Sequence, residues 1–207
     1  MNASPHDLLR VRTGALLTYD RSPPDWAREH LARAGTVVVR RARPQRSLLA
    51  VGVRGGARSE RLAAWVAPAE VEERITPEEL ASRRAWREAA RRRVPALDAL
   101  DAVAALIDPL GLAWGPVGGA GFELATGVPC LHAGSDLDVL LRAPARLARD
   151  AARPLLRALS ALAVRVDVQV ETPRGAVALA ELTADAPQVV LRTSDGPRLV
   201  ADPWGEA

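Results

Sequence analysis

The chain has 207 residues, 48% hydrophobic and 26% charged, so it can form one or two globular domains with a buried core and is not a disordered protein. It has no apolar run of about 18 residues and no signal-peptide pattern at its N-terminus, which predicts a cytoplasmic protein without membrane segments. Its single cysteine, Cys130, excludes an intramolecular disulfide, and the Cys130-x-His132 spacing is too sparse for a zinc site.

All 28 basic residues are arginine. Any mechanism that needs a lysine nucleophile or a P-loop lysine is therefore excluded, and phosphate must be held by arginine, backbone amides or a metal ion. Residues 1–100 are net positive and residues 101–207 net negative. An acidic C-terminal half with one phenylalanine and one tyrosine in the whole chain argues against nucleic acid as a partner.

Residues 1–80 are expected to form a small α+β domain. Pro24 opens a helix that Gly35 ends, and Gly55-Gly56 is expected to break a strand. The expected elements are a short strand or turn within 5–20, a helix over 25–34, strands over 36–41 and 47–54 joined by a turn at Pro44, and a helix from about Ser59.

A second domain is expected over residues 81–207, after a boundary within 75–95. Thr76, Pro77 and Glu79 form a capping box that predicts a helix running through Arg91-Arg92-Arg93 to Pro95. Two interpretations of this basic run stay open: a solvated helix face, which charge runs favour, or a docking surface for an acidic partner. The expected later elements are helices over 96–108 and 144–161, strands over 176–181, 187–193 and 198–201, and a turn at Asp195-Gly196.

The most informative motif is Asp136-Leu137-Asp138. In a strand, alternate side chains share a face, so the two aspartates lie on one face while Leu137 and Val139 lie on the buried one. Paired carboxylates suit a hard divalent cation. An Asp-x-Asp arises by chance about once in a chain of this composition, so the motif alone is weak.

Two neighbouring features strengthen it. Valines alternate with polar residues from Val164 to Glu171, which predicts a strand with Asp167 on its polar face. The simpler interpretation of Asp167 is a solvated side chain; the alternative is a third carboxylate at the same sheet edge, enough for two-metal phosphoryl or nucleotidyl transfer. Upstream, the glycine cluster from Gly118 to Gly121 offers backbone N–H groups to phosphate.

These motifs resemble a known family. The segments Trp114–Gly127, Ser135–Asp138 and Asp167–Pro173 are similar to the phosphoribosyl-dephospho-CoA transferases, which are the malonate decarboxylase holo-acyl-carrier-protein synthases. The resemblance implies an α+β fold: a nucleotidyltransferase-type mixed β-sheet flanked by helices, preceded by the small α+β N-terminal domain.

The resemblance also implies an activity. The enzyme would transfer a triphosphoribosyl-dephospho-CoA donor to a serine of the acyl carrier subunit of malonate decarboxylase, with release of pyrophosphate. Asp136, Asp138 and Asp167 would be catalytic and hold Mg²⁺, with Asp167 either a metal ligand or the proton acceptor. The expected substrate-binding residues are Gly118, Gly119, Ser135 and Arg54.

Other observations qualify that assignment. The chain departs from the family's pattern at Gly119, where a serine is common, and in the long spacing from Gly119 to Asp136. Arg54, with Arg58 and Arg61, follows a strand end and is a candidate ligand for pyrophosphate.

Two alternative functions stay open. One is a metal-dependent nucleotidyltransferase that acts on another protein or a small molecule. The other is a non-catalytic binding module, and the presence of three acidic residues in these motifs argues against it.

Overall fold

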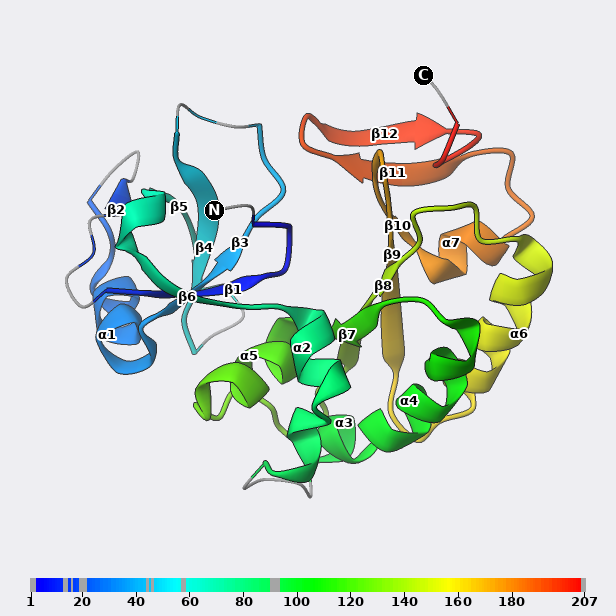
Figure 1. Ribbon diagram of the computed structural model, residues 1–207, viewed down its shortest axis with the longest axis horizontal. Coiled ribbons are helices and arrows are strands. Elements are labelled where there is room, and N and C mark those ends of the chain that lie inside the picture. The colour runs from blue at the N-terminus through cyan, green and yellow to red at the C-terminus, as the bar shows by residue number, and fades with distance from the viewer. Residues whose placement is uncertain are drawn as a thin grey trace. The chain divides into compact units, whose positions relative to one another are not determined.

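The computed structural model describes residues 3–12, 15, 17–18, 22–43, 45, 47–56, 59–89 and 94–205. The chain divides into two compact units, Met1–Thr76 and Pro77–Ala207, each with its own six-stranded sheet, so the protein is a mixed α+β protein (Figure 1). The sequence had suggested a boundary between residues 80 and 81. No helix in the described ranges is long and apolar enough to cross a membrane.

The N-terminal unit is an antiparallel sheet with helix α1 on one face. Its strand order is β2-β5-β4-β3-β1-β6. Side chains of α1 such as Ala27 and Leu31 pack on alternate residues of the central strands, including Val37, Val51 and Ala64. Its elements are β1 (Leu8–Val11), β2 (Leu17–Thr18), α1 (Asp25–Ala34), β3 (Thr36–Val39), β4 (Leu49–Arg54), β5 (Arg61–Val66), the 3₁₀ turn η1 (Pro68–Glu70) and β6 (Val71–Ile75).

The expected helix near Ser59 is wrong. Residues 61–66 form strand β5, which pairs with β4 from Arg54↔Arg61 to Leu49↔Val66. This hairpin buries the alternate residues Ala64 and Val66, and cross-strand packing of that kind outweighs the local helix tendency of an alanine-rich segment. Helix α1 and strands β3 and β4 confirm their predictions, strand β6 was not predicted, and the predicted turn at Pro44 lies outside the described residues.

The C-terminal unit has the strand order β12-β11-β10-β9-β8-β7. Strand β8 runs parallel to β9, and the other pairs recorded in this sheet are antiparallel. Its strands are β7 (Trp114–Pro116), β8 (Leu137–Arg142), β9 (Val166–Thr172), β10 (Gly175–Ala178), β11 (Val189–Thr193) and β12 (Gly196–Val200). Its helices are α2 (Pro77–Ser82), η2 (Ala85–Arg87), α3 (Pro95–Asp98), α4 (Leu100–Ile107), η3 (Asp108–Leu110), α5 (Gly118–Thr126), α6 (Arg149–Ser160) and α7 (Leu179–Thr183).

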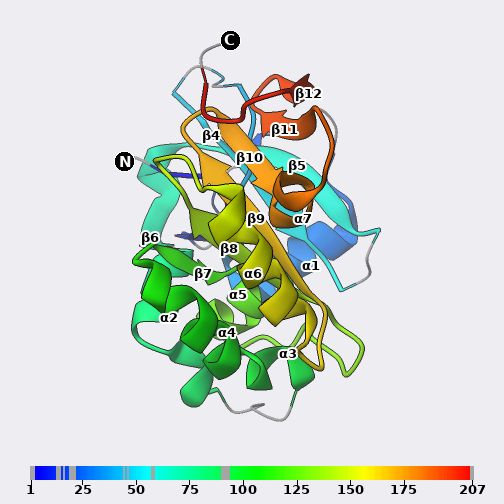
Figure 2. The ribbon, with the colours of Figure 1, turned by 90° about the vertical axis from the view of Figure 1, so that its right-hand side faces the viewer.

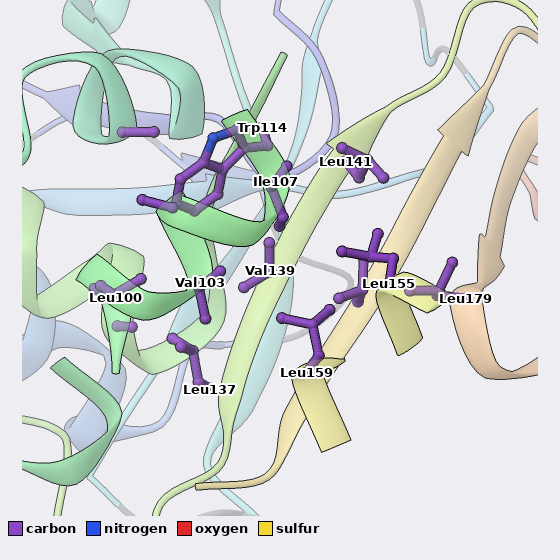
Figure 3. Close-up of a cluster of buried hydrophobic side chains, with 14 of the residues drawn as sticks. Leu100, Val103, Ile107, Trp114, Leu137, Val139, Leu141, Leu155, Leu159 and Leu179 are labelled. Atoms are coloured by element: carbon purple, nitrogen blue, oxygen red, sulfur yellow. The ribbon is translucent and has the colours of Figure 1, made fainter. Parts of the chain in front are cut away.

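The main core lies on one face of this sheet. Leu137, Val139 and Leu141 of β8 point into it and meet helices α4, α6 and α7 (Figures 2 and 3). The helix side chains seen around them are Leu100, Val103, Ile107, Leu155, Leu159 and Leu179. Because strand residues alternate between faces, this packing places Asp138 on the opposite face of β8.

Three expectations for this unit are wrong in part. The long helix from Thr76 to Pro95 ends at Ser82, because Arg84 takes a left-handed backbone (φ 51°) and the buried Trp86 anchors a 3₁₀ turn. The helix over 96–108 is interrupted at Ala99, and the strand over 176–181 ends at Ala178, where α7 begins. The Arg91-Arg92-Arg93 run lies outside the described residues. Strands β11 and β12, and the turn between them, confirm their predictions.

Candidate active site

Two of the predicted carboxylates are neighbours on adjacent strands. Asp138 of β8 and Asp167 of β9 are direct partners in the parallel register, and neighbouring strands lie about 4.8 Å apart. Asp138 is exposed and Asp167 half-buried. They share a face because their strand neighbours Val139 and Val168 are both buried. Strands β8 and β9 therefore carry two carboxylates side by side on one face of the sheet.

Asp136 and an arginine extend this arrangement by one step. The ladder continues beyond the strand ends, because the N–H of Leu137 donates to the carbonyl of Arg165 at 2.9 Å. Asp136 and Arg165 each stand two residues before an aspartate of the pair. The Nε of Arg165 lies 3.1 Å from Oδ1 of Asp167, with both side chains partly exposed to solvent. Arg165 therefore lies beside the candidate site, and it was not among the residues predicted for that site.

The candidate site offers Mg²⁺ a pair of carboxylates rather than a complete set of protein ligands. Within the described ranges, no group of three His, Cys, Asp or Glu side chains is gathered closely enough to enclose a metal ion. Mg²⁺, however, is commonly held by one or two carboxylates together with water and substrate phosphates. Asp138 and Asp167 are such a pair by position, and metal binding by Asp136, Asp138 and Asp167 stays a prediction.

Gly118, the first residue of α5, lies directly against Asp138. Its φ of 58° is a left-handed conformation that glycine adopts without strain. A Cβ built on Gly118 would collide with the carboxylate of Asp138, and the N–H of Val117 donates to the Asp138 carbonyl at 2.9 Å. The predicted glycine therefore does open a helix, and it leaves the space that the Asp138 side chain fills.

The long segment between Gly119 and Asp136 folds back over the start of α5. We call residues 127–136 the α5–β8 loop. Its Cys130 donates from Sγ to the carbonyl of Gly119 at 3.1 Å. A Cβ on Gly119 would lie 2.9 Å from Cδ2 of Leu131. Any larger side chain at position 119 would therefore make the Leu131 side chain shift.

Glu123 holds the α5–β8 loop in place. This side chain of α5 is only 6% exposed, and its Oε2 accepts hydrogen bonds from the N–H groups of Cys130 and Leu131 at 2.8 and 2.9 Å. Nothing in the sequence pattern distinguished Glu123, because its partners lie in a loop without periodicity.

We expect Glu123→Gln to destabilise the protein by about 1–3 kcal/mol, because a neutral amide oxygen accepts the two backbone hydrogen bonds without the negative charge that strengthens them. Urea denaturation measures this loss, and hydrogen exchange should show faster exchange at the Cys130 and Leu131 amides. Glu88→Gln, at an exposed site, is the control. Unchanged exchange at both amides would contradict the anchoring role.

Ser135, a predicted substrate-binding residue, closes a tight turn before Asp136. Its N–H donates to the His132 carbonyl, and its Oγ accepts from the His132 N–H, each at 3.0 Å. The N–H of Gly134 donates to Nδ1 of His132 at 3.1 Å. The exposed His132 ring stands in the same turn, and substrate binding by Ser135 stays a prediction.

Arg54 and Arg61 belong to the N-terminal unit, on β4 and β5. Asp136, Asp138 and Asp167 belong to the C-terminal unit. The third arginine of the predicted pyrophosphate grip, Arg58, lies outside the described residues. Whether Arg54 binds substrate stays a prediction.

Two tryptophan–aspartate hydrogen bonds support the strand that leads into α5. Nε1 of Trp114 donates to Asp108 at 2.8 Å, and Nε1 of Trp86 donates to Asp101 at 2.9 Å. The Trp114 hydrogen bond lowers the pKa of Asp108, burial opposes it, and Arg84 lowers it further. The two indole rings lie 6.1 Å apart, so these contacts join β7 to η2 and η3.

This pKa shift predicts a stability effect in acid. The folded-state pKa of Asp108 is below the unfolded value of about 3.9, so its contribution is present above that value and is lost as pH falls through the folded pKa. We expect the stability difference between wild type and Asp108→Asn, measured by urea denaturation, to be largest near neutral pH and to shrink below about pH 4. A difference that stays constant with pH would contradict it.

Comparison with known proteins agrees with this picture. Residues 4–77 match the family model described as the phosphoribosyl-dephospho-CoA transferase MdcG N-terminal domain, and residues 79–203 match the corresponding C-terminal domain. No solved structure matches the chain.

Three relatives are named phosphoribosyl-dephospho-CoA transferase. The protein of Pseudomonas putida (strain GB-1) is 47% identical over 205 residues, which cover 99% of this chain and 97% of the relative. That of Azotobacter vinelandii is 47% identical over 203 residues, covering 98% and 94%. That of Pseudomonas aeruginosa is 44% identical over 200 residues, covering 97% and 93%.

The protein is a two-unit α+β enzyme of the transferase class. The chain belongs to the phosphoribosyl-dephospho-CoA transferase family, over both of the family's domains.

Proposed function

We propose that this enzyme transfers the triphosphoribosyl-dephospho-CoA group to a serine of the malonate decarboxylase acyl carrier protein and releases pyrophosphate. The observation that carries the proposal is the register pairing of Asp138 with Asp167, beside the first residue of helix α5, Gly118. A carboxylate pair next to a helix N-terminus suits the transfer of a phosphoryl-containing group.

The order of elements supports a nucleotidyltransferase-type catalytic unit. Helix α5 connects the antiparallel strands β7 and β8, and helix α6 connects β8 to the parallel strand β9. This connection brings Asp138 of the Asp-x-Asp motif beside the later Asp167, near the same end of two neighbouring strands.

The aspartates and the start of helix α5 would have different roles in this reaction. Asp138 and Asp167, with Asp136 beside them, would hold Mg²⁺, which when bound neutralises the triphosphate and polarises the attacked phosphorus. The first N–H groups of α5 would donate to the donor's phosphate oxygens. The carrier serine oxygen would bond to the phosphorus attached to the ribose while the bond from that phosphorus to pyrophosphate breaks. The serine proton would pass to one of these aspartate carboxylates.

Arg165 has a defined role in this scheme. In the structure its guanidinium balances the charge of Asp167, and an exposed ion pair of this kind contributes little to stability. With Mg²⁺ bound at the carboxylates, the Arg165 guanidinium would hold the departing pyrophosphate through charge-assisted hydrogen bonds.

The test is direct transfer in solution. Purified enzyme, donor and apo-carrier should give a carrier mass increased by the donor less pyrophosphate, with one pyrophosphate per carrier. EDTA should stop the reaction, and added Mg²⁺ should restore it. A carrier mass that does not change, while another protein or a small molecule is modified, would overturn the carrier assignment in favour of the broader nucleotidyltransferase alternative.

A further inference from the structure

The N-terminal sheet has an unusual face on the side opposite α1. The core-facing residues of β4 and β5 include Val51, Val53 and Ala64, so the residues that alternate with them lie on the outer face. Strand pairing arranges these outer residues in three rows, Ala50 with Trp65, Gly52 with Ala63, and Arg54 with Arg61.

One end of this face carries a fixed cation on an aromatic ring. The guanidinium carbon of Arg40 lies 5.7 Å from the centre of the Trp65 ring. Its Nε donates to the Val51 carbonyl at 2.8 Å, and its Cδ lies 3.4 Å from where a Cβ on Gly52 would stand. Gly52 therefore lets the Arg40 stem lie flat on the sheet. Such a guanidinium–indole pair is a stacking surface for a planar base.

The other end carries an unbalanced positive charge. Arg54 and Arg61 are directly opposed across the strand pair, an arrangement that costs energy when nothing compensates it. Across the described part of the chain, neither side chain has an ion pair or hydrogen bond. A Cβ built on Gly55 would meet both the Glu60 side chain and the Trp26 ring, and Trp26 packs on the core side of the sheet, so the Glu60 side chain lies toward that side. An anion of two or more charges would relieve the repulsion between the arginines.

The two ends are joined by small side chains. Ala50, Gly52 and Ala63 separate the two ends, with the Arg40 stem lying against Gly52, and the four-residue step along β4 from Ala50 to Arg54 spans about 13 Å. A stacking surface at one end and an arginine pair at the other suit an extended small molecule better than an acidic protein surface, which needs no aromatic platform.

We propose that this face binds a nucleoside diphosphate group, with the base on Arg40 and Trp65 and the phosphates on Arg54 and Arg61. The inference rests on the proposed function, because a dephospho-CoA donor contains an adenosine diphosphate group. It gives the N-terminal unit a role in holding the donor, separate from the carboxylates of the C-terminal unit.

ADP titrated into the full-length protein tests this, with calorimetry as the readout. Arg54→Ala and Arg61→Ala should each weaken ADP binding by about tenfold or more. Trp65→Leu should weaken ADP binding but leave the binding of inorganic pyrophosphate unchanged. Arg33→Ala, an exposed arginine of α1 on the other side of the sheet, is the control and should bind ADP as wild type does.

Wild-type affinity for ADP in the Arg54→Ala/Arg61→Ala double variant would overturn the inference. So would unchanged ADP binding together with weaker binding of the apo-carrier. Asp138→Asn should bind ADP normally even if it transfers nothing. A wild-type protein that binds ADP through Arg54 but modifies no carrier would uphold the site and overturn the proposed function, so the two failures are distinguishable.

Discussion

Asp138→Asn is expected to reduce transfer by about a hundredfold to a thousandfold without unfolding the protein. The substitution removes one of two negative charges that face a common position, so a cation bound there loses much of its attraction. The Asp138 side chain is exposed, and its partner Asp167 carries a like charge. Relief of their repulsion should leave the melting temperature unchanged or slightly raised.

Matched variants make this result interpretable. Asp167→Asn should show a similar loss of transfer, whereas Asp150→Asn, at an exposed position on α6, should transfer at the wild-type rate. Initial rates across a Mg²⁺ titration should show a raised metal requirement in the first two variants. A folded Asp138→Asn enzyme with near wild-type rates and metal dependence would remove the carboxylate pair from the mechanism.

The two strands that carry Asp138 and Asp167 could be predicted from the sequence because the alternation of apolar and polar residues is a local pattern. Alternation of valines around Asp167, and of leucine and valine around Asp138, identifies both strands and their polar faces. Arg165 stands in the same alternation, two residues before Asp167, so the pattern that found Asp167 also contained the arginine. What the pattern lacked was the parallel pairing of β8 with β9, which sets these residues side by side.

The misassigned elements depend on distant contacts. Residues 61–66 are a strand because they pair with β4, and the helix from Pro77 ends early because Trp86 hydrogen-bonds to Asp101 on α4. Glu123 acts through amides of a loop that follows its own helix. None of these contacts produces a periodic pattern in the sequence, so residue propensities and motif spacing could not predict them.

Gly118→Ala should impair both stability and catalysis, for two separable reasons. An alanine at φ 58° pays about 1–2 kcal/mol for the left-handed conformation. Its Cβ would also collide with the Asp138 carboxylate, which must then change its position. A displacement of about 1 Å in a reacting group can cost about a hundredfold in rate.

Gly127, at the other end of the same helix, separates the two effects. It has a similar φ of 71°, but a Cβ built on it meets nothing within 4 Å. Gly127→Ala should therefore lose a comparable amount of stability by urea denaturation and keep its transfer rate, while Gly118→Ala loses both. If the two variants retained equal activity, Gly118 would be required only for the backbone turn into α5. If only Gly118→Ala lost transfer, the space beside Asp138 would be the reason that this position is glycine.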